Sequence, residues 1–387
     1  MQGPAPADSV APEEPTPAPT APADDATSPT DDAASEPAEP PPDAVEPPVE
    51  SSAEPAPAEP TEPAAAPVEP MPAADAPATG VPTTVPSAGS RFGLRRHRFV
   101  YKNLTALRFN PLGAVNEFQF GYRLQLVNRN TALFKESYLA LKVHTFLNPA
   151  FGRIGPMLEI QPLAILNLQA IYNGVGYFRT FDQLQSFQSP NAIYSDDALD
   201  ERTDSRYATT GHYITLAALL QAKVVRVAVR DNLKFYWADM ALSIDPTTGR
   251  QDTVYYDQTL DILHPDRGWV TTNDADIIYL FDFGLRVGAR YTLTHAFYRD
   301  SMYPAGEDTT NRNSPTHRVG PAILYSPPKW HIKAAKRTKL SRKRWMNPTA
   351  ILLVQWWAQH RWRTGEDVHP GVPYLVLGFS FEGDFFP

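Results

Sequence analysis

Residues 117–126 read EFQFGYRLQL and alternate strictly between polar and apolar side chains. Successive side chains of a β-strand point to opposite faces, so this segment would place all its apolar side chains on one face. In a helix the same apolar residues would be spread around the circumference and would form no continuous stripe. The segment therefore predicts a strand with one apolar face.

The same period of two recurs from about residue 103 to the end of the chain. Turn-forming residues separate the segments, for example at 246–249 and 265–268. The segment 104–127 is long enough for either one long strand or two short ones. The pattern predicts about 12 strands, and 10 to 14 are compatible with it. The predicted strands are 104–127, 136–148, 153–161, 163–178, 208–221, 223–241, 252–263, 274–283, 285–298, 317–327, 347–362 and 372–386.

The composition of the polar faces indicates whether the apolar faces contact lipid or a protein interior. They carry many Arg and Asp together with small polar residues and few Lys, which suits a crowded lumen where charges pair. Segments of ten or more residues suit tilted strands that cross a bilayer, and aromatic residues near segment ends resemble membrane-interface girdles. The pattern favours an all-β fold, an antiparallel transmembrane β-barrel; a soluble ligand-binding β-barrel is the alternative. Residues expected to face lipid include Phe118, Tyr122, Val227, Tyr279, Val287, Ala289 and Phe379.

The last predicted strand, Tyr374 to Phe386, alternates and ends on an aromatic residue, which Pro387 then follows. Together with the other alternating segments it resembles the outer-membrane β-barrel proteins of Gram-negative bacteria, in particular uncharacterised proteobacterial barrels with a Pro/Ala-rich leader. The resemblance implies a barrel over residues 91–387 in the bacterial outer membrane, surrounded by outer-membrane lipid. It also implies insertion by the barrel-assembly machinery and a mature chain from which a signal peptide has been removed. In such barrels the final residue is usually the aromatic one, so Pro387 departs from the pattern.

Residues 1–90 differ in composition from the rest of the chain. They contain 17 acidic side chains, 24 Pro and no Lys or Arg. Such a segment has too few apolar side chains to offset the entropy of ordering, and its like charges repel one another. The sequence predicts a disordered, Pro/Ala/Glu-rich periplasmic arm ahead of the barrel. A spacer and a docking segment for a basic partner are both compatible with this composition.

The charged side chains on the polar faces are the candidate site residues. They are predicted to face the lumen and to pair with one another across strands. Crowding by such pairs predicts a narrow or plugged channel, or a structural component of the envelope, instead of a wide porin. The predicted lumen-facing residues are Glu117, Arg123, Lys142, His144, Arg226, Arg230, Lys234, Asp257, Asp261, Asp276, Asp282, Arg286, Arg290, Arg361 and Glu382.

The sequence offers little for catalysis or for a bound cofactor. It has no Cys, and it lacks the nucleophile-elbow, zinc-protease, phosphate-loop and dinucleotide-binding motifs. Asp257 and Asp261 would share one strand face and could act as acid and base, but neutralisation of lumen Arg also explains them. We therefore expect no enzyme, no metal and no cofactor. A lipid-acting outer-membrane enzyme is the alternative.

One long connection, 328–346, is strongly basic. A solvated loop explains it, and so does binding to anionic cell-wall polymer or lipopolysaccharide; nucleic acid is not expected for an exported barrel. Counting back from a periplasmic C-terminus makes 363–371 external and 328–346 periplasmic. The side of 179–207 depends on whether Gly284 forms a turn. The basic residues are Lys329, Lys333, Lys336, Arg337, Lys339, Arg342, Lys343 and Arg344.

Overall fold

The computed structural model describes residues 96–127, 131, 133–134, 136–178, 184–246, 248–327 and 347–384. The arm predicted at 1–90, the basic loop predicted at 328–346 and the end of the last predicted strand lie outside these residues. None of the described helical segments is long and apolar enough to cross a membrane. The strands are β1 His97–Phe109, β2 Gly113–Gln125, β3 Tyr138–Leu147, β4 Phe151–Leu163, β5 Leu166–Tyr177, β6 Ser186–Phe187, β7 Thr210–Val224, β8 Val227–Met240, β9 Val254–Asp257, β10 Ile262–Pro265, β11 Gly268–Leu280, β12 Leu285–Phe297, β13 Thr316–Tyr325, β14 Thr349–Gln359 and β15 Tyr374–Asp384. The helical segments are α1 Asp196–Glu201, η1 Thr203–Ser205 and η2 Asp300–Met302.

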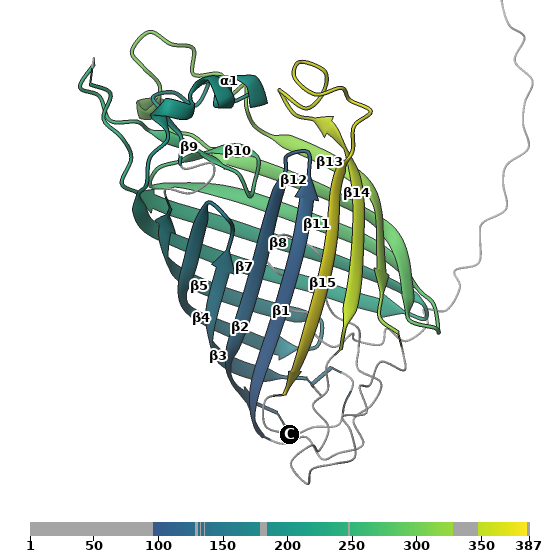
Figure 1. Cartoon of the computed structure of the whole chain (residues 1–387). Helices are drawn as coiled ribbons and strands as arrows, with labels where there is room; N and C mark the ends of the chain where they lie inside the picture. The colour runs from purple at the N-terminus through teal and green to yellow at the C-terminus, as the bar shows by residue number, and fades with distance from the viewer. Residues whose placement is uncertain are drawn as a thin grey trace, which may run out of the picture. The chain divides into compact units, whose positions relative to one another are not determined.

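Twelve strands close into one antiparallel barrel (Figure 1). Strand β1 completes the circle, because its residue Val100 pairs with Gly121 of β2 on one side and with Asp384 of β15 on the other. A closed barrel leaves no unpaired strand edge, which is the condition for crossing a bilayer with strands. The predicted all-β antiparallel barrel of about 12 strands is confirmed.

The structure corrects the prediction of which sequence segments form the twelve barrel strands. The segment 104–127 forms two strands, β1 and β2, with Asn110 in the left-handed region at φ 58° in the turn between them. The predicted strand 252–263 is not part of the barrel. It forms the hairpin β9–β10 in a separate sheet of order β10-β9-β6. Every residue of β9 and β10 is buried, so neither face of this hairpin meets lipid or water.

The two ends of the barrel carry connections of different lengths. One end has the short β4–β5, β7–β8 and β11–β12 turns, with Gly284 at φ 89° in the last of them, and also the longer β2–β3 and β13–β14 connections. The other end carries the long β5–β7, β8–β11, β12–β13 and β14–β15 connections, with α1, β9 and β10 among them (Figure 1). Outer-membrane barrels keep short turns in the periplasm and long loops outside. Residues 184–207 therefore lie at the same external end as 363–371.

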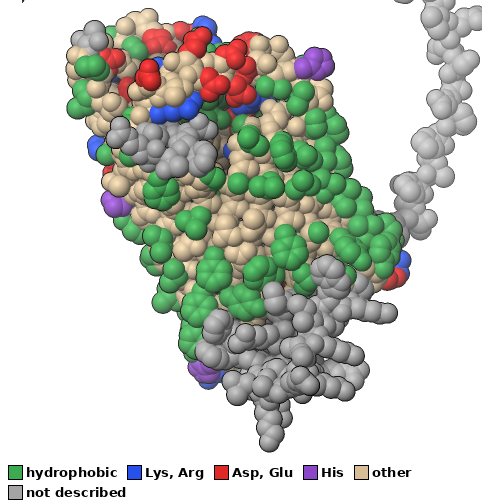
Figure 2. Space-filling model, in the orientation of Figure 1, with side chains coloured by type: hydrophobic (Ala, Val, Ile, Leu, Met, Phe, Trp, Pro, Cys, Tyr) green, Lys and Arg blue, Asp and Glu red, His purple; other side chains and the backbone are tan. Residues whose placement is uncertain are grey.

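The barrel has an apolar exterior and a polar interior. Ile277 points outward and is 57% exposed, whereas Gln355 points inward and is fully buried. Figure 2 shows hydrophobic side chains over the flank of the barrel and charged ones gathered at the end that carries α1. A soluble barrel would have the opposite arrangement, so that alternative is wrong. Among the residues expected to face lipid, the exposed ones include Phe118, Val227, Tyr279, Ala289 and Phe379.

The position of a lipid-facing residue along its strand should determine how much a charged side chain there lowers the free energy of unfolding. Leu216 lies near the middle of β7 and is exposed, while Val227 is the first residue of β8. We expect Leu216→Arg to lower the free energy of unfolding by about 2–4 kcal/mol, and Val227→Arg by about 0–1 kcal/mol, because only the first places the charge near the bilayer midplane. Urea titrations of both variants in phosphatidylcholine vesicles measure the difference. Equal costs would contradict the placement of β7 across the bilayer.

Candidate functional site

Buried ion pairs between neighbouring strands fill one side of the lumen. Arg290 on β12 donates two hydrogen bonds of 2.7 Å to Asp276 on β11. Lys234 on β8 lies 3.2 Å from Asp274, also on β11. All four side chains are buried, and a buried charge is tolerated only when it is paired and hydrogen-bonded. These pairs occupy space that would hold water in an open channel.

A second group of pairs covers the facing strands β2, β3 and β4. Glu159 on β4 forms an ion pair with Lys142 on β3 and accepts a hydrogen bond of 2.6 Å from the Tyr138 hydroxyl. Glu117 on β2 lies 3.3 Å from Nε2 of His144 on β3. Both carboxylates are buried. The charges of Lys142 and Glu159 are thus neutralised between adjacent strands.

The hairpin β9–β10 occupies the external half of the lumen. Tyr255 and Ile262 belong to an apolar cluster that includes inward-facing side chains of β3, β4, β5, β7 and β8. On the other side of the hairpin, Tyr256 packs in a cluster with Tyr194 and Trp362 of the external loops. We call residues 254–265 the plug, because they lie between the barrel wall and the external loops.

The tip of the plug is held by polar contacts from different parts of the wall. Arg108 on β1 donates a hydrogen bond of 2.9 Å to the carbonyl oxygen of Thr259. Arg153 on β4 lies 3.4 Å from a carboxylate oxygen of Asp257, and its guanidinium stacks 3.7 Å from the ring centre of Tyr213. Strands β1 and β4 are separated by β2 and β3 in the barrel. The tip is therefore bonded to more than one region of the wall.

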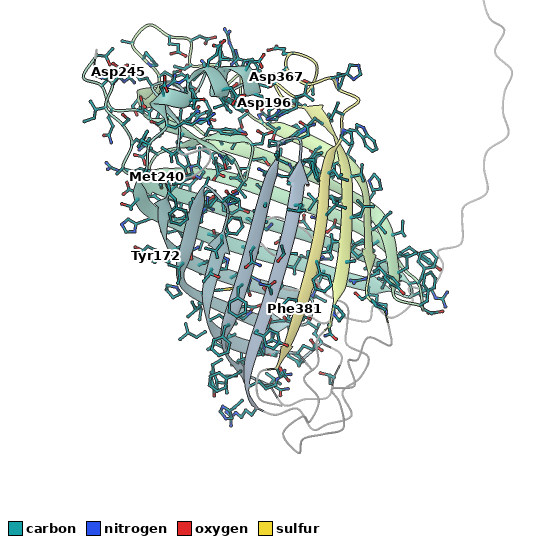
Figure 3. All side chains as sticks on the ribbon, in the orientation of Figure 1. Tyr172, Asp196, Met240, Asp245, Asp367 and Phe381 are labelled. Atoms are coloured by element: carbon teal, nitrogen blue, oxygen red, sulfur yellow. The ribbon has the colours of Figure 1, made fainter. Side chains whose placement is uncertain are left out.

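Asp261 links the plug to the external loops. Nε of Arg363, in the β14–β15 connection, donates a hydrogen bond of 3.1 Å to it, and Nη2 of the same side chain donates one of 2.8 Å to Asp196 of α1. Burial alone would raise the pKa of Asp261, but Arg363 and His360 outweigh burial and hold that pKa below its ordinary value. Asp196 and Asp367 both lie at this external end in Figure 3, and the Asp196 amide donates to Asp367 over 2.8 Å. Arg363 thus connects the plug, α1 and the β14–β15 connection.

A small polar cavity lies where the plug meets the lumen pairs. Its volume is about 30 Å³, and its lining includes Arg108, Thr259, Asp274 and Arg318. A cavity of this size has room for a few water molecules. The guanidinium of Arg318 stacks 4.1 Å from the ring centre of Tyr374, which fixes this part of the lining. The space beside the plug tip is therefore small and polar.

Most of the predicted lumen residues lie on inward faces of barrel strands. Arg123 is partly buried and stacks 3.8 Å from the ring centre of Tyr138, and Glu382 is partly buried on β15. Asp257 and Asp261 are buried in the lumen too, but they belong to the plug and flank its turn. Each contacts at least one Arg, so neither matches the acid and base pair considered from the sequence. The buried barrel residues are Glu117, Lys142, His144, Arg230, Lys234, Asp276, Arg286 and Arg290.

Three predicted lumen residues are placed elsewhere, and the prediction is wrong for them. Arg226 and Asp282 form a pair of 2.6 Å, but their side chains are 51% and 81% exposed. They lie in the β7–β8 and β11–β12 turns, where the alternation of the strands no longer determines direction. Arg361 lies beyond the end of β14, and its Nη1 donates a hydrogen bond of 3.1 Å to the carbonyl oxygen of Asn191 in the external loops.

Several charged residues of the site were missed by the sequence prediction, namely Arg108, Arg153, Glu159, Asp274, Arg318 and Arg363. Arg153 and Glu159 lie within the predicted strand 153–161, and Asp274 has the same parity as Asp276, so strict application of the alternation would have found all three. Arg363 carries no such signal, because it lies in a loop far along the chain from Asp261. Among the described residues, no group of three or more His, Asp or Glu side chains could hold a metal ion.

The plug has a predicted pH dependence through His264. Its ring is buried and stacks on Tyr255 with ring centres 5.2 Å apart. Burial lowers the pKa of His264 to about 4. The imidazole of a solvent-exposed histidine titrates near pH 6.5. Between about pH 6.5 and pH 4, His264 therefore binds a proton more readily in the undocked plug than in the docked plug. Docking of the plug weakens as the pH falls through this range. The loss of docking free energy should reach about 3 kcal/mol near pH 4.

Protease cleavage within the plug at pH 7, 5.5 and 4.5 measures this effect. We expect cleavage to increase as the pH falls, and His264→Gln to remove most of the pH dependence. If the variant kept the full dependence, another group, such as His360, would be responsible.

Comparisons with known proteins find only distant similarities. No family model matches the chain, and no curated protein matches it. Similar solved structures include a NanC porin (10% identity, TM-score 0.30, covering 73% of this chain and 98% of that one). They also include CdiB from Acinetobacter baumannii (10% identity, TM-score 0.28, covering 76% of this chain and 60% of that one). A third is OprB from Pseudomonas putida (10% identity, TM-score 0.26, covering 75% of this chain and 94% of that one). Similarity this low carries no argument about function. The closed antiparallel barrel and its apolar exterior are themselves the features of a protein of the bacterial outer membrane.

Proposed function

We propose that the protein is an outer-membrane channel that is closed in its resting state by the plug and by the buried ion pairs beneath it. One observation carries the proposal. The tip of the plug bonds to Arg108 on β1, to Arg153 on β4 and to Arg363 in the β14–β15 connection. A hairpin anchored to separate parts of the wall and the loops leaves little free cross-section in a barrel of this size.

The polar interior favours a closed channel over a purely structural barrel. Lys234, Asp274, Asp276 and Arg290 are held by neighbouring strands, and a water-lined path could form beside them once the plug has left. A barrel that served only as a scaffold would be as well filled by apolar side chains, since replacing buried ion pairs by apolar residues is often neutral or stabilising. Loss of the plug is therefore the proposed opening step.

Release of glucose from loaded proteoliposomes tests this function. We expect slow release at pH 7, close to that of protein-free vesicles, and faster release at pH 4.5, where the plug is weakened. Fast release at pH 7 would contradict the closed state. No release at either pH, and none after removal of the plug, would favour a structural component of the envelope.

A further inference from the structure

The small polar cavity beside the plug tip is lined by two guanidinium groups. Arg108 on β1 and Arg318 on β13 both line this space of about 30 Å³. Strands β1 and β13 are separated by β15 and β14 in the barrel, so the two side chains reach the cavity from different parts of the wall. An Arg guanidinium stays protonated in proteins and offers only donors. The cavity therefore brings two permanent positive charges together.

Neither guanidinium is neutralised in the way that the other lumen cations are. Arg108 donates to the carbonyl oxygens of Gln258 and Thr259 in the plug. The guanidinium of Arg318 lies against aromatic faces, 4.1 Å from the ring centre of Tyr374 and 5.1 Å from that of Trp357. Within the part of the chain that the structure describes, neither forms an ion pair with a carboxylate, whereas the buried cations Lys142, Lys234 and Arg290 each have one.

The same cavity is lined by hydrogen-bond donors that have no partner. Nε of Arg108 and Nε of Arg318 are buried, and neither has a hydrogen-bond partner among the described residues. The same holds for the hydroxyl of Thr259, which belongs to the plug and also lines the cavity. Buried polar atoms without a protein partner are commonly satisfied by water or by an ion. Two uncompensated guanidinium groups favour an ion, and it must be an anion.

The acidic side chain in the lining, Asp274, is bonded to other residues. Its carboxylate lies 3.2 Å from Nζ of Lys234 and accepts a hydrogen bond of 2.8 Å from the hydroxyl of Thr292. The charge of Asp274 is thus compensated by Lys234, and the charges of Arg108 and Arg318 remain. A carboxylate at the edge of the cavity repels additional negative charge, so a monovalent anion is favoured over a divalent one.

We propose that this cavity binds one small monovalent inorganic anion of the size of chloride, between Arg108 and Arg318 and within reach of the Thr259 hydroxyl. A space with room for a few water molecules also has room for one such ion. Because Thr259 belongs to the plug and Arg108 is bonded to it, the complete site exists only while the plug is docked. Anion binding therefore stabilises the docked plug. The site is additional to the proposed channel function, and binding does not depend on conduction.

Anomalous scattering from bromide, which replaces chloride with little change in size, locates the ion. The detergent-extracted full chain is crystallised in sodium bromide. We expect one anomalous difference peak in the cavity between Arg108 and Arg318. Water density in the cavity without an anomalous peak would overturn the proposal. This measurement uses the unmodified protein, so it decides the question even if a variant of the site does not fold.

Protease cleavage within the plug at pH 7 measures the effect of the anion on docking. Sodium chloride is compared with sodium gluconate at equal ionic strength, since gluconate is too large for the cavity. We expect cleavage to be about fivefold slower in chloride, because cleavage follows the population of the undocked plug. Arg318→Gln should remove most of this difference between the two salts.

Arg123→Gln is the matched control. Arg123 stacks 3.8 Å from the ring centre of Tyr138, much as Arg318 stacks on Tyr374, but it does not line the cavity. The control should keep the full chloride effect, and heat-modifiable gel mobility confirms that both variants are folded. Equal cleavage of the intact protein in the two salts would overturn the proposal. An unchanged chloride effect in Arg318→Gln would show that the anion acts elsewhere, and stronger protection by sulfate would contradict a monovalent site.

Discussion

Removal of the plug is expected to convert a closed barrel into a conducting one. The deletion is geometrically simple, because the Asp266 amide donates a hydrogen bond of 2.9 Å to the carbonyl oxygen of Thr253 and the two ends of the hairpin therefore meet. A short Gly-Ser linker between these residues would replace 254–265. We expect single-channel conductance in planar bilayers to rise by about tenfold or more, since the external half of the lumen loses its main filling.

The barrel itself should survive this change. Strands β8 and β11 pair along their whole length, from Gly268 opposite Ala238 to Tyr279 opposite Val227, without help from the plug. A matched control removes exposed residues 308–310 from the β12–β13 connection and should leave conductance unchanged. If the plug deletion folded, as judged by heat-modifiable mobility, but did not conduct, loss of the plug would not be an opening step, and a structural component of the envelope would be favoured.

Replacing Arg363 is the point mutation with the largest expected effect. In Arg363→Gln the buried Asp261 would lose its guanidinium partner and would keep the imidazole of His360, whose pKa burial lowers, as its remaining ion-pair neighbour among the described residues. Removing one partner of a buried ion pair costs about 3–5 kcal/mol. We expect this cost to appear as weaker plug docking, with faster proteolysis of the plug and more frequent channel openings.

Two further variants separate the role of Arg363 from a general effect of charge. Arg363→Lys should be intermediate, because an ammonium cannot bond to Asp261 and Asp196 with the fixed fork of a guanidinium. Arg361→Gln removes a cation two residues away that contacts the carbonyl oxygen of Asn191 and not the plug. It should leave the plug docked. Equal proteolysis of Arg361→Gln and Arg363→Gln would show that loop charge in general, and not the Arg363 contact, holds the plug.

The barrel could be predicted from the sequence because lipid and lumen impose opposite requirements on alternate residues. The segment 117–126 lies in and just beyond β2, with Glu117 and Gln119 buried in the lumen and Phe118 exposed on the outside. The same rule gives the correct direction for Asp276 and Arg290. It fails in the turns at Arg226 and Asp282, where the backbone leaves the strand conformation.

The plug could not be predicted because its alternation has another cause. Tyr255 and Tyr256 point to opposite faces, yet both are buried, one against the barrel wall and the other against the external loops. In a single sequence such a strand resembles one that crosses the membrane. The contact between Asp261 and Arg363 joins a hairpin turn to a distant loop, and no local pattern connects the two. The proposed closed state therefore depends on tertiary contacts that the sequence alone does not indicate.

Single-channel recording of the unmodified protein in planar bilayers at neutral pH tests the central claim most directly. The plug tip is bonded to β1, to β4 and to the β14–β15 connection, and the cavity beside it has a volume of about 30 Å³. The predicted result is a current at the baseline, interrupted at most by brief, small openings. Stable, large steps like those of a wide porin would contradict the claim that the plug and the buried ion pairs close the lumen.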